Sequence, residues 1–442
     1  MIVKRTFVHM PKNRLKLPHR PTTLAVLRAA AVLLVTCLAL ATRAHGADWP
    51  QWLGPERNGV STETIAPWKE FPAATWQRDT AGGFSVPVVA DGLLFVHAAV
   101  PDRDEEDVIA IDARTGSDLW HEISPRAPYS SQLGVGPRAT PSVVNGRLYT
   151  TGITGVISCY EARTGVRLWQ RNPWEDLGVP RPDFGVCASP VVVDGKLIVA
   201  VGGEGASIVA LDADTGELSW KALDEPAGAA SPIVVTRGEG TERRNEIVAQ
   251  TTLRLVGLAP QDGTIRWEHP LVFQPSGVSP TSLAVGSRLV CSTQDTGTLT
   301  LRIPDDTPAA TPALEWWKQD LSSYFSTGTV DSRGRVYLVT NQIMPLPRAD
   351  IRCLDVASGE QRWVQAGAGY FHVGMILLSD GRLLTLNDAG TLVLAEPTDT
   401  ESVELARAKV CGGTFCNPVL ADGRLYVRDG KGVTCFTPGQ VP

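Results

Sequence analysis

Residues 110–120 read AIDARTGSDLW, and related copies of this segment recur along the chain. The copies at 159–169 (CYEARTGVRLW) and 210–220 (ALDADTGELSW) keep the acidic residue, the Thr-Gly pair and the final Trp. Looser copies stand at 257–267 (GLAPQDGTIRW) and 353–363 (CLDVASGEQRW). The acidic side chain can accept hydrogen bonds from the backbone N–H groups of a tight turn, and Gly supplies the positive φ that the turn needs. Each copy predicts a strand, a tight turn and a second strand, whose Trp seals one repeat against the next.

A second recurring element precedes these copies. It consists of a Pro or Gly, a few β-branched residues, an Asp-Gly or Asn-Gly pair and another apolar run. Good copies are 86–96 (VPVVADGLLFV), 140–149 (TPSVVNGRLY), 189–198 (SPVVVDGKLI) and 417–426 (NPVLADGRLY). An Asp-Gly or Asn-Gly pair between alternating apolar runs is a strong hairpin signal.

Together the two elements make a repeat of four strands. The final Trp residues are spaced 44 to 51 residues apart, from Trp76 to Trp363. Four-stranded repeats of this length are typical of a β-propeller. The repeat starts count to eight, and the last repeat stops before its Trp. We therefore expect an all-β, eight-bladed propeller with antiparallel blades, in which the strand at Ala74–Trp76 completes the C-terminal blade and closes the ring.

The N-terminal 46 residues differ in composition from the rest of the chain. They hold eight Lys or Arg and no acidic residue, followed by an apolar stretch at 29–41 and small residues up to Gly46. This pattern predicts a cleaved signal peptide over 1–46 and a periplasmic or secreted protein. A retained anchor helix and a lipoprotein modified at Cys37 are the alternatives. We expect a strap over 47–73, the propeller over 74–442 and no spanning helix in the mature protein.

The charge balance narrows the classes of partner. The chain has 41 basic and 47 acidic residues, and without residues 1–46 it keeps 33 basic residues against the 47 acidic ones, a net charge of −14. Such an acidic protein is a poor candidate for binding nucleic acid or anionic lipid.

The repeat resembles the tryptophan-docking unit of the pyrroloquinoline-quinone (PQQ) type propellers. The resemblance covers nearly all of the chain after residue 46, including the segments 49–61 (WPQWLGPERNGVS) and 136–141 (GPRATP). It implies that the recurring Trp residues dock neighbouring blades: Trp76, Trp120, Trp169, Trp220, Trp267, Trp316 and Trp363. Two branches share this repeat, namely quinoprotein dehydrogenases that hold PQQ and Ca²⁺ on the axis, and BamB-like scaffolds that present loops to partner proteins.

Few residues match the enzyme branch. Those dehydrogenases commonly stack PQQ on a disulfide between adjacent cysteines, and this chain has no adjacent pair. PQQ carries three carboxylates, and Arg138 is the candidate cofactor-binding residue on the face that would receive it. We assign no catalytic residue and no Ca²⁺ ligand, because the Glu, Asn and Asp positions of those dehydrogenases cannot be matched residue by residue. The histidines after residue 46 show no metal-binding spacing.

The scaffold branch requires only exposed loops. Two linkers, 121–137 and 170–186, are much longer than their equivalents. They carry the aromatic and Arg residues typical of protein-binding surfaces, namely Tyr129, Arg171, Trp174, Arg181 and Phe184. Either these loops bind a partner or they close the mouth of the ring.

Our interpretation is a scaffold that binds envelope or secreted proteins without a cofactor. The alternative is a PQQ- and Ca²⁺-dependent oxidoreductase acting on alcohols or sugars. Arg138, Cys187, His372 and Cys416 each begin an inner strand and are expected at the axial channel. His372 is either a pH-sensitive ligand or a structural channel residue, and a disulfide between Cys411 and Cys416 is one possible state of that pair.

Overall fold

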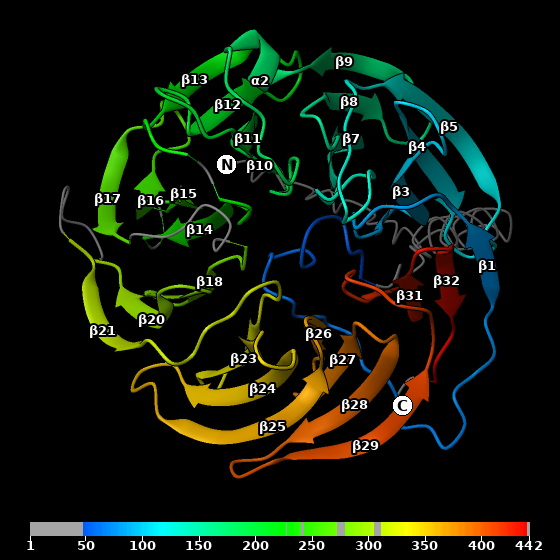
Figure 1. Ribbon diagram of the computed structural model, residues 1–442, viewed down its shortest axis with the longest axis vertical. Coiled ribbons are helices and arrows are strands. Elements are labelled where there is room, and N and C mark those ends of the chain that lie inside the picture. Colours follow the sequence, from blue (N-terminus) through cyan, green and yellow to red (C-terminus); the bar gives the residue numbers. More distant parts are fainter. Residues whose placement is uncertain are drawn as a thin grey trace, which may run out of the picture. The chain divides into compact units, whose positions relative to one another are not determined.

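Eight four-stranded antiparallel sheets contain all the strands in the described part of the chain. The computed structural model describes residues 47–226, 228–238, 240, 243–271, 279–304 and 311–439. The sheets follow one another around a central axis (Figure 1). The predicted all-β fold and the eight-bladed propeller are therefore confirmed. The predicted signal peptide, with Cys37, lies outside the described residues.

Each blade runs from an inner strand beside the axis to an outer strand at the rim. Blade 1 consists of β2 (Val88–Ala90), β3 (Leu93–Ala99), β4 (Glu105–Asp112) and β5 (Asp118–Pro125). Blade 2 consists of β6 (Ser142–Val144), β7 (Arg147–Thr151), β8 (Ile157–Glu161) and β9 (Arg167–Arg171). Blade 3 consists of β10 (Val191–Val193), β11 (Lys196–Ala200), β12 (Ile208–Asp212) and β13 (Leu218–Ala222). Blade 4 consists of β14 (Ile233–Arg237), β15 (Arg244–Gln250), β16 (Arg254–Leu258) and β17 (Ile265–Pro270). Blade 5 consists of β18 (Leu283–Val285), β19 (Arg288–Thr293), β20 (Gly297–Arg302) and β21 (Ala313–Lys318). Blade 6 consists of β22 (Thr329–Val330), β23 (Arg335–Gln342), β24 (Arg348–Asp355) and β25 (Gln361–Gly369). Blade 7 is β26 (Val373–Leu377), β27 (Leu383–Asn387), β28 (Thr391–Pro397) and β29 (Ser402–Lys409).

The eighth blade joins the two ends of the described chain. Its inner strands are β30 (Val419–Ala421), β31 (Arg424–Arg428) and β32 (Gly432–Phe436), and its outer strand is β1 (Trp76–Asp79). Strand β1 pairs antiparallel with β32, with Trp76 opposite Cys435 and Asp79 opposite Gly432. The expected closure of the ring by the strand at Trp76 is confirmed, and it pairs the edge that β32 would otherwise expose.

The Thr-Gly turn of the first blade has the expected geometry. Asp112 Oδ1 accepts hydrogen bonds from the N–H groups of Arg114 and Thr115 at 3.0 and 2.8 Å, and from the Thr115 hydroxyl at 2.9 Å. Gly116 then has a φ of 76°, in the left-handed region that favours glycine. The carboxylate thus satisfies the turn's backbone donors, and the glycine lets the chain reverse.

Five of the seven docking Trp residues lie over the turn glycine of the next blade. Trp120 Nε1 donates to the Ala162 carbonyl at 3.0 Å, and a Cβ added to Gly165 would lie 2.6 Å from the Trp120 ring. The same contact joins Trp76 to Gly116, Trp169 to Gly216, Trp220 to Gly263 and Trp316 to Gly359. The turn glycine is therefore required twice, for its positive φ and for the close approach of the indole.

Two Trp residues dock differently because the blade that follows them lacks the Thr-Gly turn. Trp267 Nε1 donates to Glu246 Oε1 at 2.8 Å, within its own blade. Trp363 Nε1 donates to the Thr398 carbonyl of the seventh blade at 3.0 Å. Both indoles are buried, so blade packing continues even where the turn is irregular.

The Ser-Pro and Thr-Pro pairs link neighbouring inner strands around the axis. The Val86 N–H donates to Thr140 Oγ1 at 3.3 Å, and the Thr140 N–H donates to Ser189 Oγ at 2.9 Å. The Ser189 N–H in turn donates to Ser231 Oγ at 2.8 Å. These hydroxyls accept the backbone N–H groups that face the axis, which would otherwise be buried without partners.

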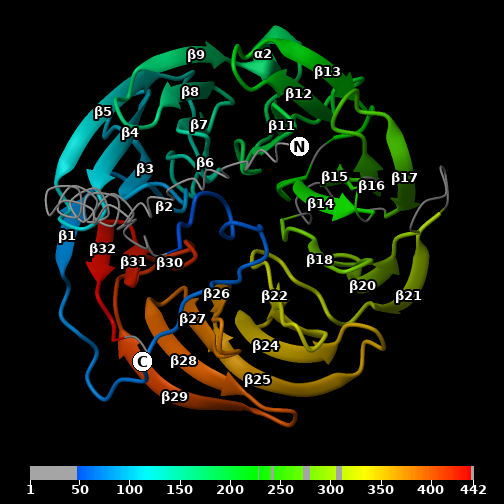
Figure 2. The ribbon, with the colours of Figure 1, turned by 180° about the vertical axis from the view of Figure 1, so that it is seen from behind.

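An N-terminal segment, residues 49–61, occupies the central channel, and we call it the axial segment. Figure 2 shows it in blue, crossing the centre of the ring. Its first residue pairs with the first blade, Trp49 opposite Val89, and its end pairs with the seventh, Val60 opposite Leu377. The Trp52 indole donates to Thr281 Oγ1 at 3.0 Å, so the fifth blade is held as well.

Arg57 anchors the middle of the axial segment. Its guanidinium donates to the carbonyls of Pro190 and Ser189 at 3.0 and 3.1 Å, and to Gln51 Oε1 at 3.2 Å. Burial lowers the pKa of Arg57 to about 9, which still leaves it protonated at neutral pH. Three acceptors offset part of the cost of burying this charge.

We expect Trp76→Ala to destabilise the whole propeller by about 3 kcal/mol, because it removes both the packing on Gly116 and the hydrogen bond to Ala113. Thermal or urea unfolding of the purified protein measures this loss. The control is Trp317→Ala at an exposed indole of β21, which should cost less than about 1 kcal/mol. Equal losses for the two variants would contradict closure through Trp76.

Candidate functional site

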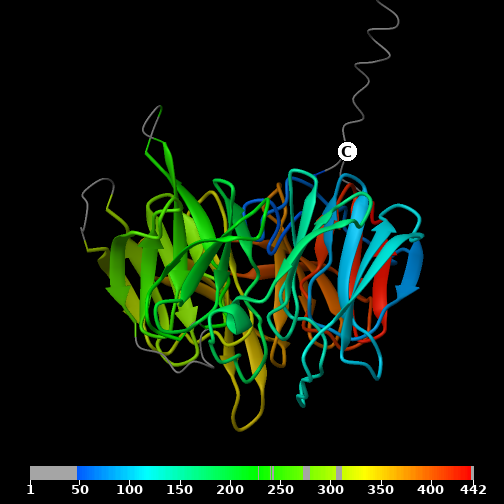
Figure 3. The same ribbon diagram turned by 90° about the horizontal axis from the view of Figure 1, so that it is seen from above.

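The long loops lie on one face of the ring, which we call the linker face. It carries the linkers from each outer strand to the next inner strand and the turns between the second and third strands of each blade. In Figure 3 the hairpin of β23 and β24 (yellow) and the linker after β5 (cyan) both project on this side. The described helix α2 (Pro173–Asp176) lies in the linker after β9.

Aromatic side chains surround the axis on this face, and we call them the axial aromatic cluster. Phe415 lies 5.5 Å from Phe84, 5.8 Å from Phe325 and 5.9 Å from His372, measured between ring centroids. Tyr324 packs on Phe325 at 3.9 Å. Four different linkers contribute these rings, so they come together only when the ring closes.

His372 lies buried at the base of this cluster. Its Nδ1 is 3.0 Å from the Ser326 hydroxyl. Burial lowers the pKa of His372 to about 4, against the opposing effect of the Asp388 carboxylate. The imidazole is therefore neutral at physiological pH, as a buried channel residue rather than an exposed ligand.

The structure brings three of the sequence-predicted residues together. The Arg138 guanidinium donates to the carbonyl oxygens of Phe184 and Gly134 and lies 6.0 Å from the Phe84 ring. The Tyr129 hydroxyl donates to the Asp183 carbonyl at 3.3 Å. The two long linkers are thus tied to each other, and Arg138 is engaged by the chain itself.

The other predicted loop residues lie apart. Arg171 donates to the Gly216 carbonyl at 3.4 Å, and Arg181 is exposed on the second long linker. Trp174 lies in α2, is only 1% exposed and donates to the Val201 carbonyl at 3.0 Å. Its indole belongs to the core between the second and third blades and is not accessible to a partner.

The cysteines near the axis are free thiols. Cys411 and Cys416 are not joined by a disulfide, and the Cys416 thiol donates to the Phe84 carbonyl at 3.5 Å. Burial raises the pKa of Cys416, which keeps it protonated. Cys187 is partly buried, and burial raises the pKa of its thiol too.

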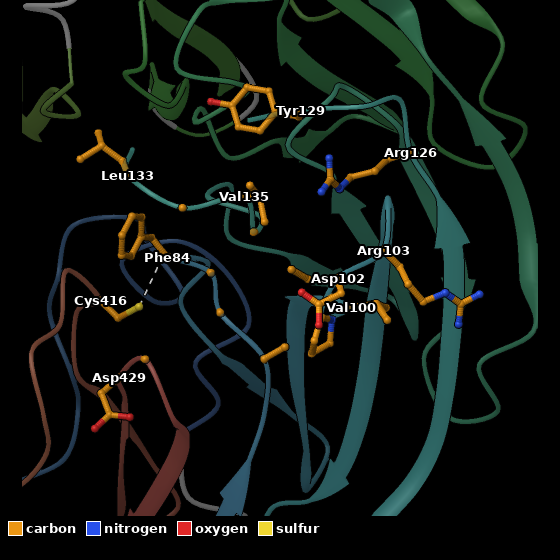
Figure 4. A pocket seen from close by; sticks show the side chains of 18 of the residues that line it. Phe84, Val100, Asp102, Arg103, Arg126, Tyr129, Leu133, Val135, Cys416 and Asp429 are labelled. Atoms are coloured by element: carbon orange, nitrogen blue, oxygen red, sulfur yellow. Dashed lines mark hydrogen bonds between the residues drawn. The ribbon is translucent and has the colours of Figure 1, made fainter. Parts of the chain in front are cut away.

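A cleft that the sequence did not reveal opens between the loops of the eighth and first blades. It has a volume of about 640 Å³ and is lined in part by residues 81–84, 99–104 and 133–136 (Figure 4). We call it the linker cleft. The glycine-rich run 81–83 before the first inner strand was its only sequence signal.

Two observations bear on a PQQ and Ca²⁺ site at the axis. Within the described ranges, no three His, Cys, Asp or Glu side chains are grouped so that they could hold a metal ion. Arg138, the predicted partner of the PQQ carboxylates, instead bonds backbone carbonyls.

The fold and its docking Trp residues define an eight-bladed propeller of the PQQ type. A family model described as outer membrane protein assembly factor BamB matches residues 104–365, more than half of the chain. The chain therefore belongs to this family. None of the helices in the described ranges has the length and apolar character needed to cross a membrane.

Known proteins of both branches are similar to this chain. The BamB protein of Yersinia pestis is 21% identical over 343 residues, covering 75% of this chain and 82% of that protein. The quinohemoprotein alcohol dehydrogenase ADH IIB of Pseudomonas putida is 26% identical over 228 residues, covering 45% of this chain. The matched region spans only 32% of the length of that dehydrogenase.

Solved structures agree on the fold. A europium-containing methanol dehydrogenase superposes with a TM-score of 0.60 at 15% identity, over 89% of this chain and 90% of its own. BamB from Moraxella catarrhalis superposes with a TM-score of 0.54 at 14% identity, over 84% and 98%. At such identities the likeness establishes the propeller alone.

We expect His372 to make the folded state sensitive to acid. Its pKa is about 4 in the folded protein and about 6.5 when unfolded, so the unfolded state binds more protons between these values. The contribution of the neutral imidazole to the free energy of unfolding is fully present above about pH 6.5. It falls by about 3 kcal/mol as the pH drops through 4. Urea unfolding of His372→Gln at pH 7, 5.5 and 4.5 should therefore show a shallower pH dependence than the parent.

The matched control is His121→Gln. Asp107 and Asp118 raise the pKa of the partly exposed His121 against the opposing effect of burial, so its contribution has the opposite sign. Identical pH profiles for His372→Gln and the parent protein would contradict the buried, neutral imidazole.

Proposed function

We propose that this protein is an extracytoplasmic scaffold that binds partner proteins through its linker face. The observation that carries the proposal is a set of exposed apolar side chains on six loop positions of that face. They are Leu133, Phe184, Leu253, Met344, Leu346 and Tyr370. Loops on a rigid scaffold often carry binding residues, and apolar side chains exposed on them are stabilised when a partner buries them.

The sixth blade supplies the most exposed of these side chains. Met344 is 77% exposed and Leu346 is 74% exposed, both in the turn between β23 and β24. These two strands have eight residues each, whereas the equivalent β7 and β8 have five each. The longer strands carry the turn beyond the neighbouring loops (Figure 3). An apolar turn held away from the body is suited to insertion into a partner.

The axial segment supports the choice of face. It fills the channel from the first blade to the seventh, with Arg57 and Trp49 buried. The long linkers from outer to inner strands end at the entry of these inner strands, on the linker face. Loops on a rigid scaffold are where binding residues are most often found.

The proposed location rests on the predicted signal peptide and on the BamB family. Partner proteins of the envelope or secreted proteins are the corresponding proposal. The acidic composition after residue 46 disfavours nucleic acid as a partner. The alternative oxidoreductase is favoured only by the quinohemoprotein relatives, whose similarity covers less than half of this chain.

Photo-crosslinking in the intact envelope tests the proposal. A photoreactive amino acid replaces Leu346 or Phe184, and both variants should give adducts with a protein of the same mass. The control position is Leu314 on outer strand β21, which is about as exposed as Phe184 but lies at the rim. No adduct at the linker face, or the same adducts from Leu314, would overturn the scaffold.

A second experiment, on the purified protein, distinguishes the scaffold from the alternative oxidoreductase. Addition of PQQ and Ca²⁺ should leave its melting temperature unchanged and should give no dye reduction with alcohols or sugars. Stoichiometric quinone absorbance accompanied by turnover would replace the scaffold with an oxidoreductase.

A further inference from the structure

The linker cleft is shaped by a close crossing of two loops. A Cβ added to Gly136 would lie 2.2 Å from the Gly82 carbonyl oxygen, so only glycine lets these loops pass. Phe84 stands at the axial end of the cleft, beside Cys416, and Gly430 lines the wall contributed by the eighth blade. The volume of about 640 Å³ is within the range of known ligand pockets.

One side of the cleft is apolar. Figure 4 shows Phe84, Leu133 and Val135 around the same space, with Val100 on the facing loop. Leu133 is 48% exposed, and Val135 is also exposed. These side chains are in contact with water in the free protein, so a bulky apolar group that covered them would be stabilised by their burial.

The other side of the cleft is negatively charged. The two arginines that line it are already paired, Arg126 with Asp104 at 3.3 Å and Arg103 with Glu105 at 2.7 Å. Asp102 is exposed, and no described residue forms an ion pair with its carboxylate. In Figure 4 this carboxylate lies beside the cavity, across from Phe84.

Asp429 contributes a second carboxylate to the cleft. Its carboxylate accepts the N–H groups of Gly412 and Lys431, both at distances below 3 Å, and lines the wall formed by the eighth blade. No cationic side chain neutralises it among the ion pairs of the described residues. The cleft therefore combines an apolar wall with carboxylates that lack a cationic partner.

We propose that the linker cleft binds an extended peptide segment of the partner, in which a bulky apolar side chain stands next to a Lys or Arg. The apolar side chain packs against Phe84, Leu133 and Val135, and the cation faces Asp102. This inference rests on the proposed scaffold function and names the sequence type that the partner presents. Exposed peptide backbone at the glycines of the wall allows a main chain to approach closely.

The chain offers two positions at which the cleft can be filled without disturbing the fold. A Cβ added to Gly82 or Gly430 meets no atom within 4 Å, and neither residue has the positive φ that disfavours other side chains. Both glycines line the cleft, so Gly82→Phe and Gly430→Phe each place a ring at its wall. Asp102 has a φ of 57°, which Asn tolerates, so Asp102→Asn removes only the charge.

The test uses fluorescein-labelled peptides and the full chain in a fluorescence polarisation assay. The three probes share flanking Gly and Ser residues and differ in a central Phe-Lys, Phe-Glu or Ser-Lys pair. We expect the Phe-Lys peptide to bind most tightly, with an affinity that falls as salt is added. Asp102→Asn should weaken it about threefold, and each Phe variant should weaken it more than tenfold.

Two controls separate the cleft from the rest of the surface. Asp176→Asn removes an exposed carboxylate in α2, and Gly439→Phe adds a ring near Ala66, both outside the cleft. Neither should change the affinity, and thermal melting verifies that every variant is folded. Equal binding of the three peptides, binding unchanged in folded Gly82→Phe and Gly430→Phe, or no binding up to about 1 mM would overturn the proposal.

The two experiments distinguish an error in the proposed peptide cleft from an error in the proposed scaffold function. If the Leu346 crosslink persists in Gly430→Phe and no peptide binds, the cleft proposal is wrong while the scaffold stands. If peptides bind but no envelope crosslink forms, the cleft stands and the scaffold is wrong.

Discussion

The contact between a Trp of one blade and a glycine of the next is the interaction on which the ring depends. At five of the contacts between neighbouring blades, the indole lies very close to the turn glycine. A Cβ added to that glycine would be less than 3 Å from an indole atom. The same glycine has a positive φ, and in the turns of Asp112, Asp212 and Asp355 the carboxylate accepts two of the turn's N–H groups. One short motif therefore builds a turn inside its own blade and a docking surface for its neighbour. Where the turn is missing, Trp267 bonds Glu246 in its own blade instead.

Closure adds a second constraint. The outer strand of the eighth blade comes from the N-terminal side of the chain, and Trp76 then docks on the first blade as the other Trp residues do. The axial segment acts at the centre, where Arg57 bonds the third blade while Trp49 and Val60 pair with the first and seventh. The ring is thus held both at its rim and at its axis, and the linker face carries the long loops.

The chemistry of that face is set by loops that meet only in the closed ring. The Arg138 guanidinium, which the sequence suggested as a cofactor-binding group, joins the two long linkers through the Phe184 and Gly134 carbonyls. Tyr129 and Phe184 lie near it, whereas Trp174 is part of the core because α2 turns its indole inward. The cleft beside Phe84 combines residues from the first and eighth blades, which lie at opposite ends of the sequence.

The sequence by itself determined the architecture, because each blade is built from local contacts that repeat in order. The Thr-Gly turn, the Asp-Gly hairpin and the spacing of the Trp residues were sufficient to predict eight blades and closure at Trp76. Only the tertiary structure decided which loop residues are exposed, that Cys411 and Cys416 are free and that a cleft lies beside Asp102. Those features depend on side chains brought together from distant linkers, and no local pattern encodes which linkers will meet.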